Sequence, residues 1–253
     1  MTKIWSAISG DASDPLVVVV HGSMDRSAGL LKLSRRLDSE FEVLRYDRRG
    51  YGRSIESTGP YEMSHQVDDL AELLNERSSS PRATLVFGHS FGGVVALALA
   101  DRHPDLVAAV GVYEAPMSWL DWWPGSSPGG SALSVVDPGD AAEEFLRRLM
   151  GNDSWERLSN AKQETRRAEG AAMMGELTDL REHEPWSATR IGAPVLAMYG
   201  ENAKPHHQRA MKTLGKTLDN CRLEQIPGAG HFGPYSHPDL VAACLTQFIE
   251  SVD

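Results

Sequence analysis

Cysteine is scarce in this chain of 253 residues, which contains only Cys221 and Cys244. Two thiols cannot build a disulfide framework, and neither has a metal-ligand spacing with a nearby histidine. Because a free cysteine packs as a small hydrophobic side chain, we expect both to be buried thiols.

Long apolar runs and an excess of basic charge are also missing. The longest apolar runs, residues 16–20 and 94–100, are far shorter than the roughly 20 residues that cross a bilayer. Acidic residues outnumber basic ones 35 to 25, and the resulting net charge of -10 repels polyanions. We therefore expect no membrane span and no nucleic-acid partner. Residues 1–5 lead into polar residues rather than the apolar segment of a secretory signal, so we expect a cytoplasmic protein.

Short apolar segments rich in β-branched residues recur along the chain, which is typical of buried strands. They are residues 16–20, 42–46, 84–87, 108–113, 195–199 and 222–226. Helical patterns lie between them, such as the apolar stripe of Val67, Leu70, Ala71 and Leu74 within residues 64–77 and the last helix after Pro238. This alternation predicts an α/β fold with a doubly wound, mostly parallel sheet.

The alternation stops between residues 117 and 186, where helical patterns follow a segment rich in proline, glycine and serine. We interpret residues 117–186 as a helical cap inserted into a core domain formed by residues 1–116 and 187–253. Five of the six tryptophans lie in this insertion, at positions 119, 122, 123, 155 and 186. Such side chains could cover a ligand pocket, or they could only pack the inserted helices against the core domain.

The segment Gly88-His89-Ser90-Phe91-Gly92 joins a predicted strand to a predicted helix. A strand that turns into a helix through G-x-S-x-G holds its serine on a strained corner with Oγ exposed. A serine here could also serve only as a helix cap, but glycines at positions 88, 92 and 93 allow the tight turn and the close packing that an elbow requires. Ser90 is therefore the candidate nucleophile.

Four motifs in order resemble those of the α/β-hydrolase family: His21-Gly22-Ser23-Met24, the loop Asp47-Arg48-Arg49-Gly50-Tyr51-Gly52-Arg53-Ser54, the elbow at Ser90, and Gly228-Ala229-Gly230-His231-Phe232. The first stands where the family has its oxyanion loop, and the second is similar to the D-x-R-G-x-G-x-S loop. The fourth is similar to the G-x-G-H segment that delivers the catalytic base. The resemblance implies an α/β-hydrolase fold with a helical cap, in which His231 activates Ser90.

The position of the triad acid departs from the common pattern. The family usually has it after the strand at residues 195–199, in a segment that resembles G-E-x-D, but this chain has Gly200-Glu201-Asn202-Ala203. Part of the family has the acid at the end of an earlier strand, and Glu114 ends the strand at 108–113. A charged residue there needs a partner, which an imidazolium would supply. We therefore expect Glu114 to be the acid. The alternatives are that Glu114 pairs with an arginine at the cap junction, or that the acid position is taken by Glu201 or Asn202.

Two backbone N–H groups should form the oxyanion hole, one from Phe91 and one from the loop after Gly22, where Ser23 is preferred to Met24. We expect His206 and His207 to lie in the pocket or on the surface. The expected substrate-pocket residues are Met24, His21, Trp119, Trp122 and Phe232.

These residues predict a serine hydrolase that cleaves a carboxylic ester, or a related thioester, lactone or amide, through an acyl-enzyme on Ser90. The expected substrate is a small molecule with a neutral or apolar acyl group, and no metal or cofactor is implied. One alternative is a carbon–carbon bond hydrolase or lyase that uses the same residues as acid and base. Another is a ligand-binding homologue whose activity has decayed, which Ala203 makes worth testing.

Overall fold

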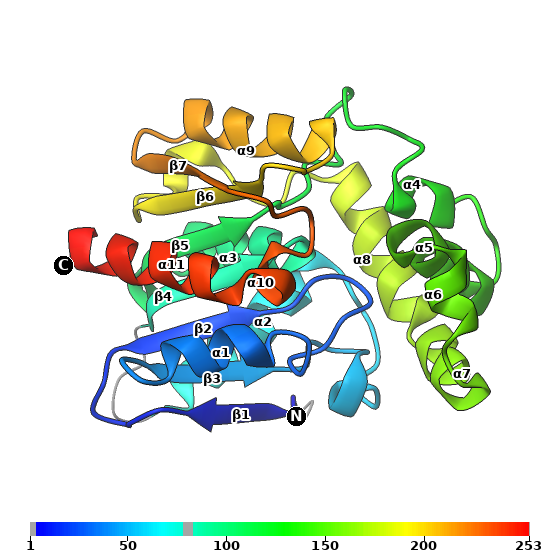
Figure 1. Cartoon of the computed structure of the whole chain (residues 1–253), viewed down its shortest axis with the longest axis horizontal. Coiled ribbons are helices and arrows are strands. Elements are labelled where there is room, and N and C mark those ends of the chain that lie inside the picture. Colours follow the sequence, from blue (N-terminus) through cyan, green and yellow to red (C-terminus); the bar gives the residue numbers. More distant parts are fainter. Residues whose placement is uncertain (1–3, 78–82, 253) are drawn as a thin grey trace.

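The computed structural model describes residues 4–77 and 83–252 (Figure 1). Residues 1–3, on which part of the argument against a secretory signal rested, lie outside the described residues. A seven-stranded sheet forms the core, in the order β1-β3-β2-β4-β5-β6-β7, with every neighbouring pair parallel except β1 and β3. The strands are β1 (Ser6–Ser9), β2 (Leu16–Val20), β3 (Glu42–Tyr46), β4 (Ala83–His89), β5 (Val107–Tyr113), β6 (Val195–Gly200) and β7 (Cys221–Ile226). The prediction of a doubly wound, mostly parallel sheet is confirmed.

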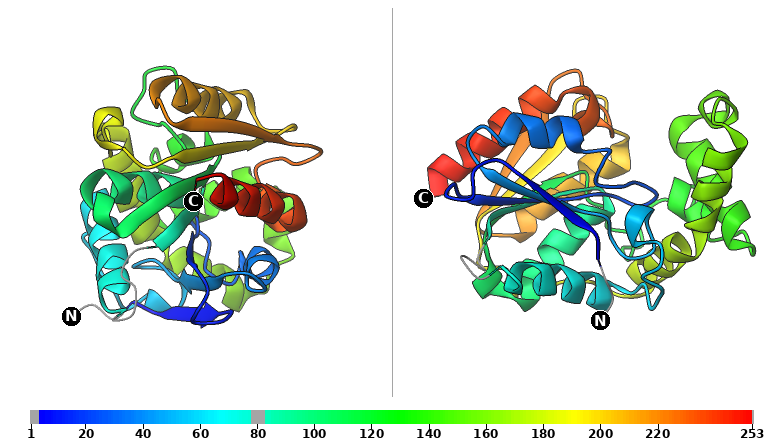
Figure 2. Two further views of the ribbon diagram at one scale, coloured as in Figure 1. Left: turned by 90° about the vertical axis from the view of Figure 1, so that its left-hand side faces the viewer. Right: turned by 90° about the horizontal axis from the view of Figure 1, so that it is seen from below.

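Each central strand is apolar throughout because its alternate side chains enter two different cores. In β2, Leu16, Val18 and Val20 face one core, whereas Val17 and Val19 face the other. Helices α2 (Met63–Asn75), α3 (Phe91–Arg102) and α9 (Pro205–Thr217) cover the first face, and α1 (Leu31–Leu37) and α11 (Pro238–Val252) cover the second (Figure 2). Short helical turns complete the connections, namely α10 (Gly233–Ser236) and the 3-10 helices at Gly52–Ser54, Pro104–Leu106 and Ala188–Arg190.

Strand β1 was not predicted from the sequence. It pairs antiparallel with β3 at the edge of the sheet, with Ser6 opposite Tyr46. Its residues Ser-Ala-Ile-Ser alternate between exposed and half-buried positions, so the strand carries no apolar run. An edge strand with one solvated face has little hydrophobic signal over four residues.

Five α-helices lie between β5 and β6, beyond the carboxyl ends of the central strands (Figure 1). We call them the cap helices: α4 (Pro128–Ala132), α5 (Pro138–Met150), α6 (Asn152–Glu156), α7 (Asn160–Ala168) and α8 (Gly170–Glu182). Trp155 is 1% exposed within an apolar cluster that includes Phe145, Leu146 and Met173. This tryptophan packs the cap helices together.

Buried ion pairs fasten the cap helices to the core. Arg48 and Glu176 of α8 are both fully buried and lie 2.6 Å apart, and Arg48 also donates to the main-chain carbonyls of His21 and Gly22. Tyr51 donates a further hydrogen bond to Glu176 at 2.7 Å. Removing one partner of such a pair would leave an uncompensated buried charge, which costs about 3–5 kcal/mol.

Both cysteines are free but only half-buried. The expectation of buried thiols is therefore wrong, because Cys221 begins the edge strand β7 and Cys244 lies at the margin of the buried face of α11. Burial still raises the pKa of the Cys221 thiol to about 11. Among the described residues, no helix is both long and apolar enough to cross a membrane.

Candidate active site

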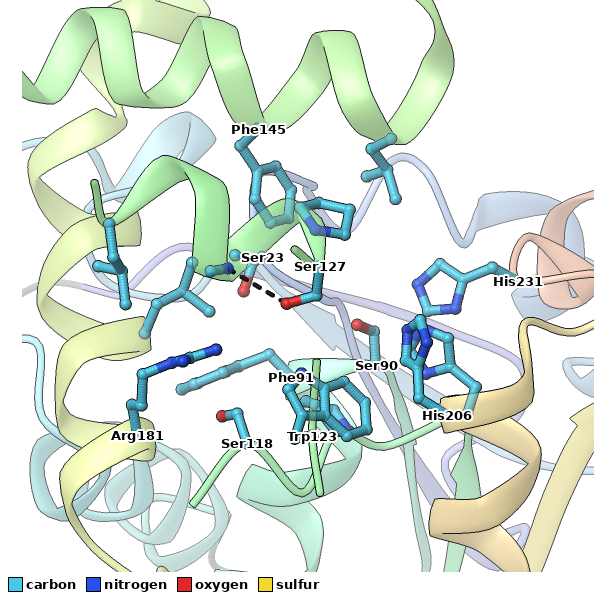
Figure 3. A pocket seen from close by; sticks show the side chains of 18 residues that line it. Ser23, Ser90, Phe91, Ser118, Trp123, Ser127, Phe145, Arg181, His206 and His231 are labelled. Atoms are coloured by element: carbon cyan, nitrogen blue, oxygen red, sulfur yellow. Dashed lines mark hydrogen bonds between the residues drawn. The ribbon is translucent and has the colours of Figure 1, made fainter. Parts of the chain in front are cut away.

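Ser90 stands on the turn between β4 and α3, with φ 53° and ψ −125°. Its N–H donates to the carbonyl of Tyr113 at 2.8 Å, which ties the turn to the adjacent strand β5. Although Ser90 occupies the N-cap position, its side chain makes no capping hydrogen bond. The hydroxyl is therefore free to face the cavity in front of the turn (Figure 3).

Two glycines make this turn possible through close backbone contacts. A Cβ on Gly88 would lie 2.1 Å from the carbonyl oxygen of Gly92, and one on Gly92 would lie 2.3 Å from the carbonyl oxygen of Val20. No side chain fits at either position, so the G-x-S-x-G spacing follows from the packing of α3 against β2 and β4.

His231 and Glu114 meet beside this turn. Oε2 of Glu114 lies 2.7 Å from Nδ1 of His231, and Oε1 accepts the N–H of Gly200 at 3.0 Å. Glu114 is fully buried, whereas the His231 side chain is 17% exposed. The carboxylate fixes the proton on Nδ1, which leaves Nε2 to act towards the cavity.

Strand order explains this meeting. Strands β4, β5 and β6 are adjacent and parallel, so their carboxyl ends present Ser90, Glu114 and Gly200 at one edge of the sheet. The loop after β7 then brings His231 back over this edge.

Backbone strain is concentrated at the same place. Within the described chain, the non-glycine residues with positive φ are Met24 (56°), Ser90 (53°) and Glu114 (50°). Such conformations cost of order 1–3 kcal/mol each and persist only where the surrounding structure imposes them. The strain marks the elbow, the proposed acid and the loop after Gly22 as one constrained unit.

No hydrogen bond joins Ser90 Oγ to His231 in the described part of the chain, although both side chains line one cavity (Figure 3). Catalytic contacts of this kind commonly tighten only when substrate is bound. Proton transfer would therefore require the two side chains to approach to hydrogen-bond distance.

The other candidates for the acid lie elsewhere. Glu201 is exposed, and its carboxylate accepts the N–H of Gly228 at 2.8 Å. Asn202 is also exposed and donates to the carbonyl of Gly228, while Ala203 is buried. Glu114 Oε2 contacts Nδ1 of His231, and within the described residues Glu114 forms no ion pair with an arginine.

Ser23 and Phe91, the predicted donors of the oxyanion hole, both line the cavity with Ser90. Phe91 is the first residue of α3, so its N–H has no acceptor within the helix. Gly22 lies against Ser90, since a Cβ on it would be 3.1 Å from the Ser90 Cβ. Met24 is 3% exposed, and its carbonyl accepts a hydrogen bond from Arg166.

The five predicted pocket residues are not among those that line this cavity. His21 and Met24 are buried, with 0% and 3% exposure. Trp119 packs edge-on against Trp186, Trp122 lies under Arg209, and Phe232 turns outward with 39% exposure. The residues that line the cavity are Ser23, Ser90, Phe91, Pro116, Ser118, Trp123, Ser127, Pro128, Gly129, Gly130, Leu133, Phe145, Leu149, Leu177, Arg181, His206, His207 and His231.

His207 has a closer relation to the site than the sequence suggested. Its ring stacks on His231 with centroids 4.5 Å apart and an interplanar angle of 25°. Trp123 packs edge-on against both His206 and His207. Burial, helped by the nearby His231, holds the pKa of His207 well below its ordinary value, so this ring presents a neutral aromatic face to the base.

Two further histidines support the site from behind. His21 Nε2 accepts the N–H of Arg48 at 2.9 Å, and His89 Nε2 lies 2.8 Å from the carbonyl oxygen of His231. Both rings are almost fully buried. Burial is the main cause that holds both pKa values well below the ordinary value of 6.5, so both rings are neutral in the folded protein.

These two histidines predict a stability that falls in mild acid. Unfolding restores their ordinary pKa, so below pH 6.5 the unfolded chain binds more protons and its formation becomes easier. The pair should lower the free energy of unfolding by at most about 2.7 kcal/mol per pH unit, with full stability above pH 6.5. Urea unfolding at pH 7.5, 6.5 and 5.5 measures the effect. His89→Gln should reduce the slope, and an unchanged slope would contradict this account.

Metal-ligating side chains come together at one place in the described residues. Ligand atoms of Glu114, His207 and His231 all lie within 4.8 Å of one another. Because Glu114 and His231 already share a hydrogen bond, a cation would have to displace the proton between them. Binding of a metal ion by these three side chains would therefore compete with the hydrogen bond between Glu114 and His231.

Comparison with known proteins decides the family. The sequence matches the Alpha/beta hydrolase family over residues 17–244. This chain belongs to that family. Curated relatives include a 2-(acetamidomethylene)succinate hydrolase from Mesorhizobium japonicum, 25% identical over 98% of this chain and 93% of its own length. A pimeloyl-[acyl-carrier protein] methyl ester esterase from Chromobacterium violaceum is 26% identical over 94% and 95%.

Solved structures agree with this family assignment at the level of the fold. An enol-lactonase from Burkholderia xenovorans superposes with a TM-score of 0.76 at 23% identity, covering 98% of this chain and 96% of its own. A thermophilic esterase from Thermogutta terrifontis has the same TM-score at 22% identity, with 98% and 93% covered. At 22% and 23% identity these two structures show the fold alone, whereas the family match and the names of the curated relatives indicate a hydrolase.

Proposed function

We propose that this α/β-hydrolase is a serine hydrolase that cleaves a carboxylic ester or a related acyl bond. The observation that carries the proposal is the 2.7 Å contact between Glu114 Oε2 and His231 Nδ1 beside the strained turn at Ser90. A serine hydroxyl is a weak nucleophile unless an oriented base takes its proton. The named esterase and lactonase among the homologues act on bonds of this class.

In the proposed reaction, Ser90 Oγ attacks the substrate carbonyl carbon while His231 Nε2 takes the hydroxyl proton. The N–H groups of Phe91 and Ser23 bind the resulting oxyanion. His231 then gives its proton to the leaving group as the acyl bond breaks. Water releases the acyl group from Ser90 through the same base, and Glu114 stabilises the imidazolium at each step.

Trapping the acyl-enzyme tests this proposal. A fluorophosphonate probe should label the protein once, on the peptide that contains Ser90, and a 4-nitrophenyl ester should give a burst of nitrophenol equal to the enzyme concentration. A carbon–carbon bond lyase that uses Ser90 only in proton transfer would turn over without an acyl-enzyme. Folded protein that takes up no probe would instead support a binding protein.

A further inference from the structure

Arg181 of α8 enters the cavity from the side opposite His231, and its guanidinium faces the space in front of Ser90 (Figure 3). The side chain is half-buried. Among the residues that line the cavity it carries the only fixed charge, since no aspartate, glutamate or lysine is present there. A protein with a net charge of -10 thus places one unopposed cation in its candidate active site.

The absence of a counter-ion distinguishes Arg181 from its neighbours. Four arginines of α5 and α7 each form an ion pair with a carboxylate within residues 140–169, namely Arg147, Arg148, Arg166 and Arg167. Within residues 4–77 and 83–252, Arg181 has neither an ion pair nor a hydrogen bond. Desolvating a guanidinium without a partner is unfavourable, so the arrangement favours an anion supplied from outside.

The surroundings of Arg181 suit a carboxylate. Gly130 leaves its guanidinium uncovered, because a Cβ at that position would lie 3.0 Å from Nη2. The Ser127 hydroxyl accepts the N–H of Gly130 at 3.2 Å and retains its own proton to donate. Arginine presents a planar fork of N–H groups that matches the two oxygens of a carboxylate.

We propose that Arg181 binds a carboxylate of the substrate, so that the molecule cleaved is a carboxylate-bearing acyl compound such as a half-ester of a dicarboxylic acid. This inference rests on the proposed hydrolase function and specifies its substrate class. It departs from the neutral or apolar acyl group expected from the sequence. The apolar walls formed by Leu177, Phe145 and Trp123 suit the carbon chain between the two ends.

Matched esters test the inference. Mono-4-nitrophenyl succinate, glutarate and adipate are compared with 4-nitrophenyl butyrate, pentanoate and hexanoate, after subtraction of the enzyme-free rates. The wild-type kcat/KM should favour the best half-ester over its neutral counterpart at least about tenfold. Arg181→Gln should lower the ratio of kcat/KM for the half-ester to kcat/KM for its neutral counterpart by ten- to hundredfold. Arg181→Lys should keep part of the advantage.

Controls separate this result from general damage. Arg102→Gln, which replaces an exposed arginine away from the cavity, should keep the preference. A preference for the neutral ester in every wild-type pair, or an unchanged preference in Arg181→Gln, would overturn the carboxylate site.

Binding distinguishes failure of this inference from failure of the proposed hydrolase. Glutarate and adipate are titrated calorimetrically into Ser90→Ala and into Ser90→Ala/Arg181→Gln. If glutarate or adipate binds to Ser90→Ala and binds at least tenfold more weakly to Ser90→Ala/Arg181→Gln, the carboxylate site is supported. This holds even if the wild-type protein hydrolyses no ester. Equal affinity in the two proteins, or no binding to the first, would refute it.

Discussion

Replacement of Ser90 by alanine is expected to lower kcat/KM for a 4-nitrophenyl ester by about 10⁴-fold or more and to abolish fluorophosphonate labelling. The reason is the loss of the Oγ that forms the acyl-enzyme, while the backbone that holds the oxyanion donors stays in place. The residual rate would come from substrate binding and the oxyanion hole alone. Stopped-flow kinetics and intact mass measure the two effects.

An exposed serine provides the matched control. Ser134→Ala removes a hydroxyl outside the cavity and should leave kcat/KM within about twofold of wild type. Because the Ser90 side chain makes no capping bond, Ser90→Ala should also fold normally, with an unchanged far-UV spectrum. Full activity in folded Ser90→Ala would disprove the proposed nucleophile.

Replacement of Glu114 by glutamine should lower kcat by about 10³- to 10⁴-fold with little change in KM. The amide oxygen can still accept the N–H of Gly200, but an amide NH₂ towards His231 would favour the tautomer with its proton on Nε2. That tautomer cannot take the Ser90 proton, and the neutral amide no longer stabilises the imidazolium. Steady-state kinetics on the same ester checks the expectation.

Glu201 is the informative comparison because it occupies the more usual region for the acid. Its exposed carboxylate binds the N–H of Gly228, so Glu201→Gln should keep kcat within about threefold. If Glu114→Gln kept full activity while Glu201→Gln lost it, the proposed acid would be wrong. A loss in both variants would call for their melting temperatures before any role is assigned.

The sequence was most informative where chemistry coincides with strand ends. Buried parallel strands have strong apolar runs, so six strands were predicted within a few residues of their bounds. Glu114 could be singled out because a charged residue ends such a run, and adjacent parallel strands bring their carboxyl ends together. The hydrogen-bond partner of Glu114 is His231, the residue that was predicted to be its partner.

The walls of the cavity were much harder to predict. Tryptophans were assigned to the pocket by size, but only packing decides that Trp123 reaches the cavity while Trp119 and Trp122 do not. Arg181 resembles an ordinary surface residue of a helix in the sequence. A signal was present in its spacing, since Leu177 and Arg181 are four residues apart and share one helix face.

The buried pair of Arg48 and Glu176 has a mechanical consequence. One guanidinium holds the carbonyls of His21 and Gly22, next to the proposed oxyanion donor, and also the carboxylate of α8, the helix that carries Arg181. Swinging the cap helices away as a lid would separate opposite charges inside an apolar interior. We therefore expect the cap helices to stay in place against the core, held by the same guanidinium that binds the carbonyls of His21 and Gly22. Substrate specificity should then change through substitution of the cap side chains that line the cavity rather than through movement of the cap helices.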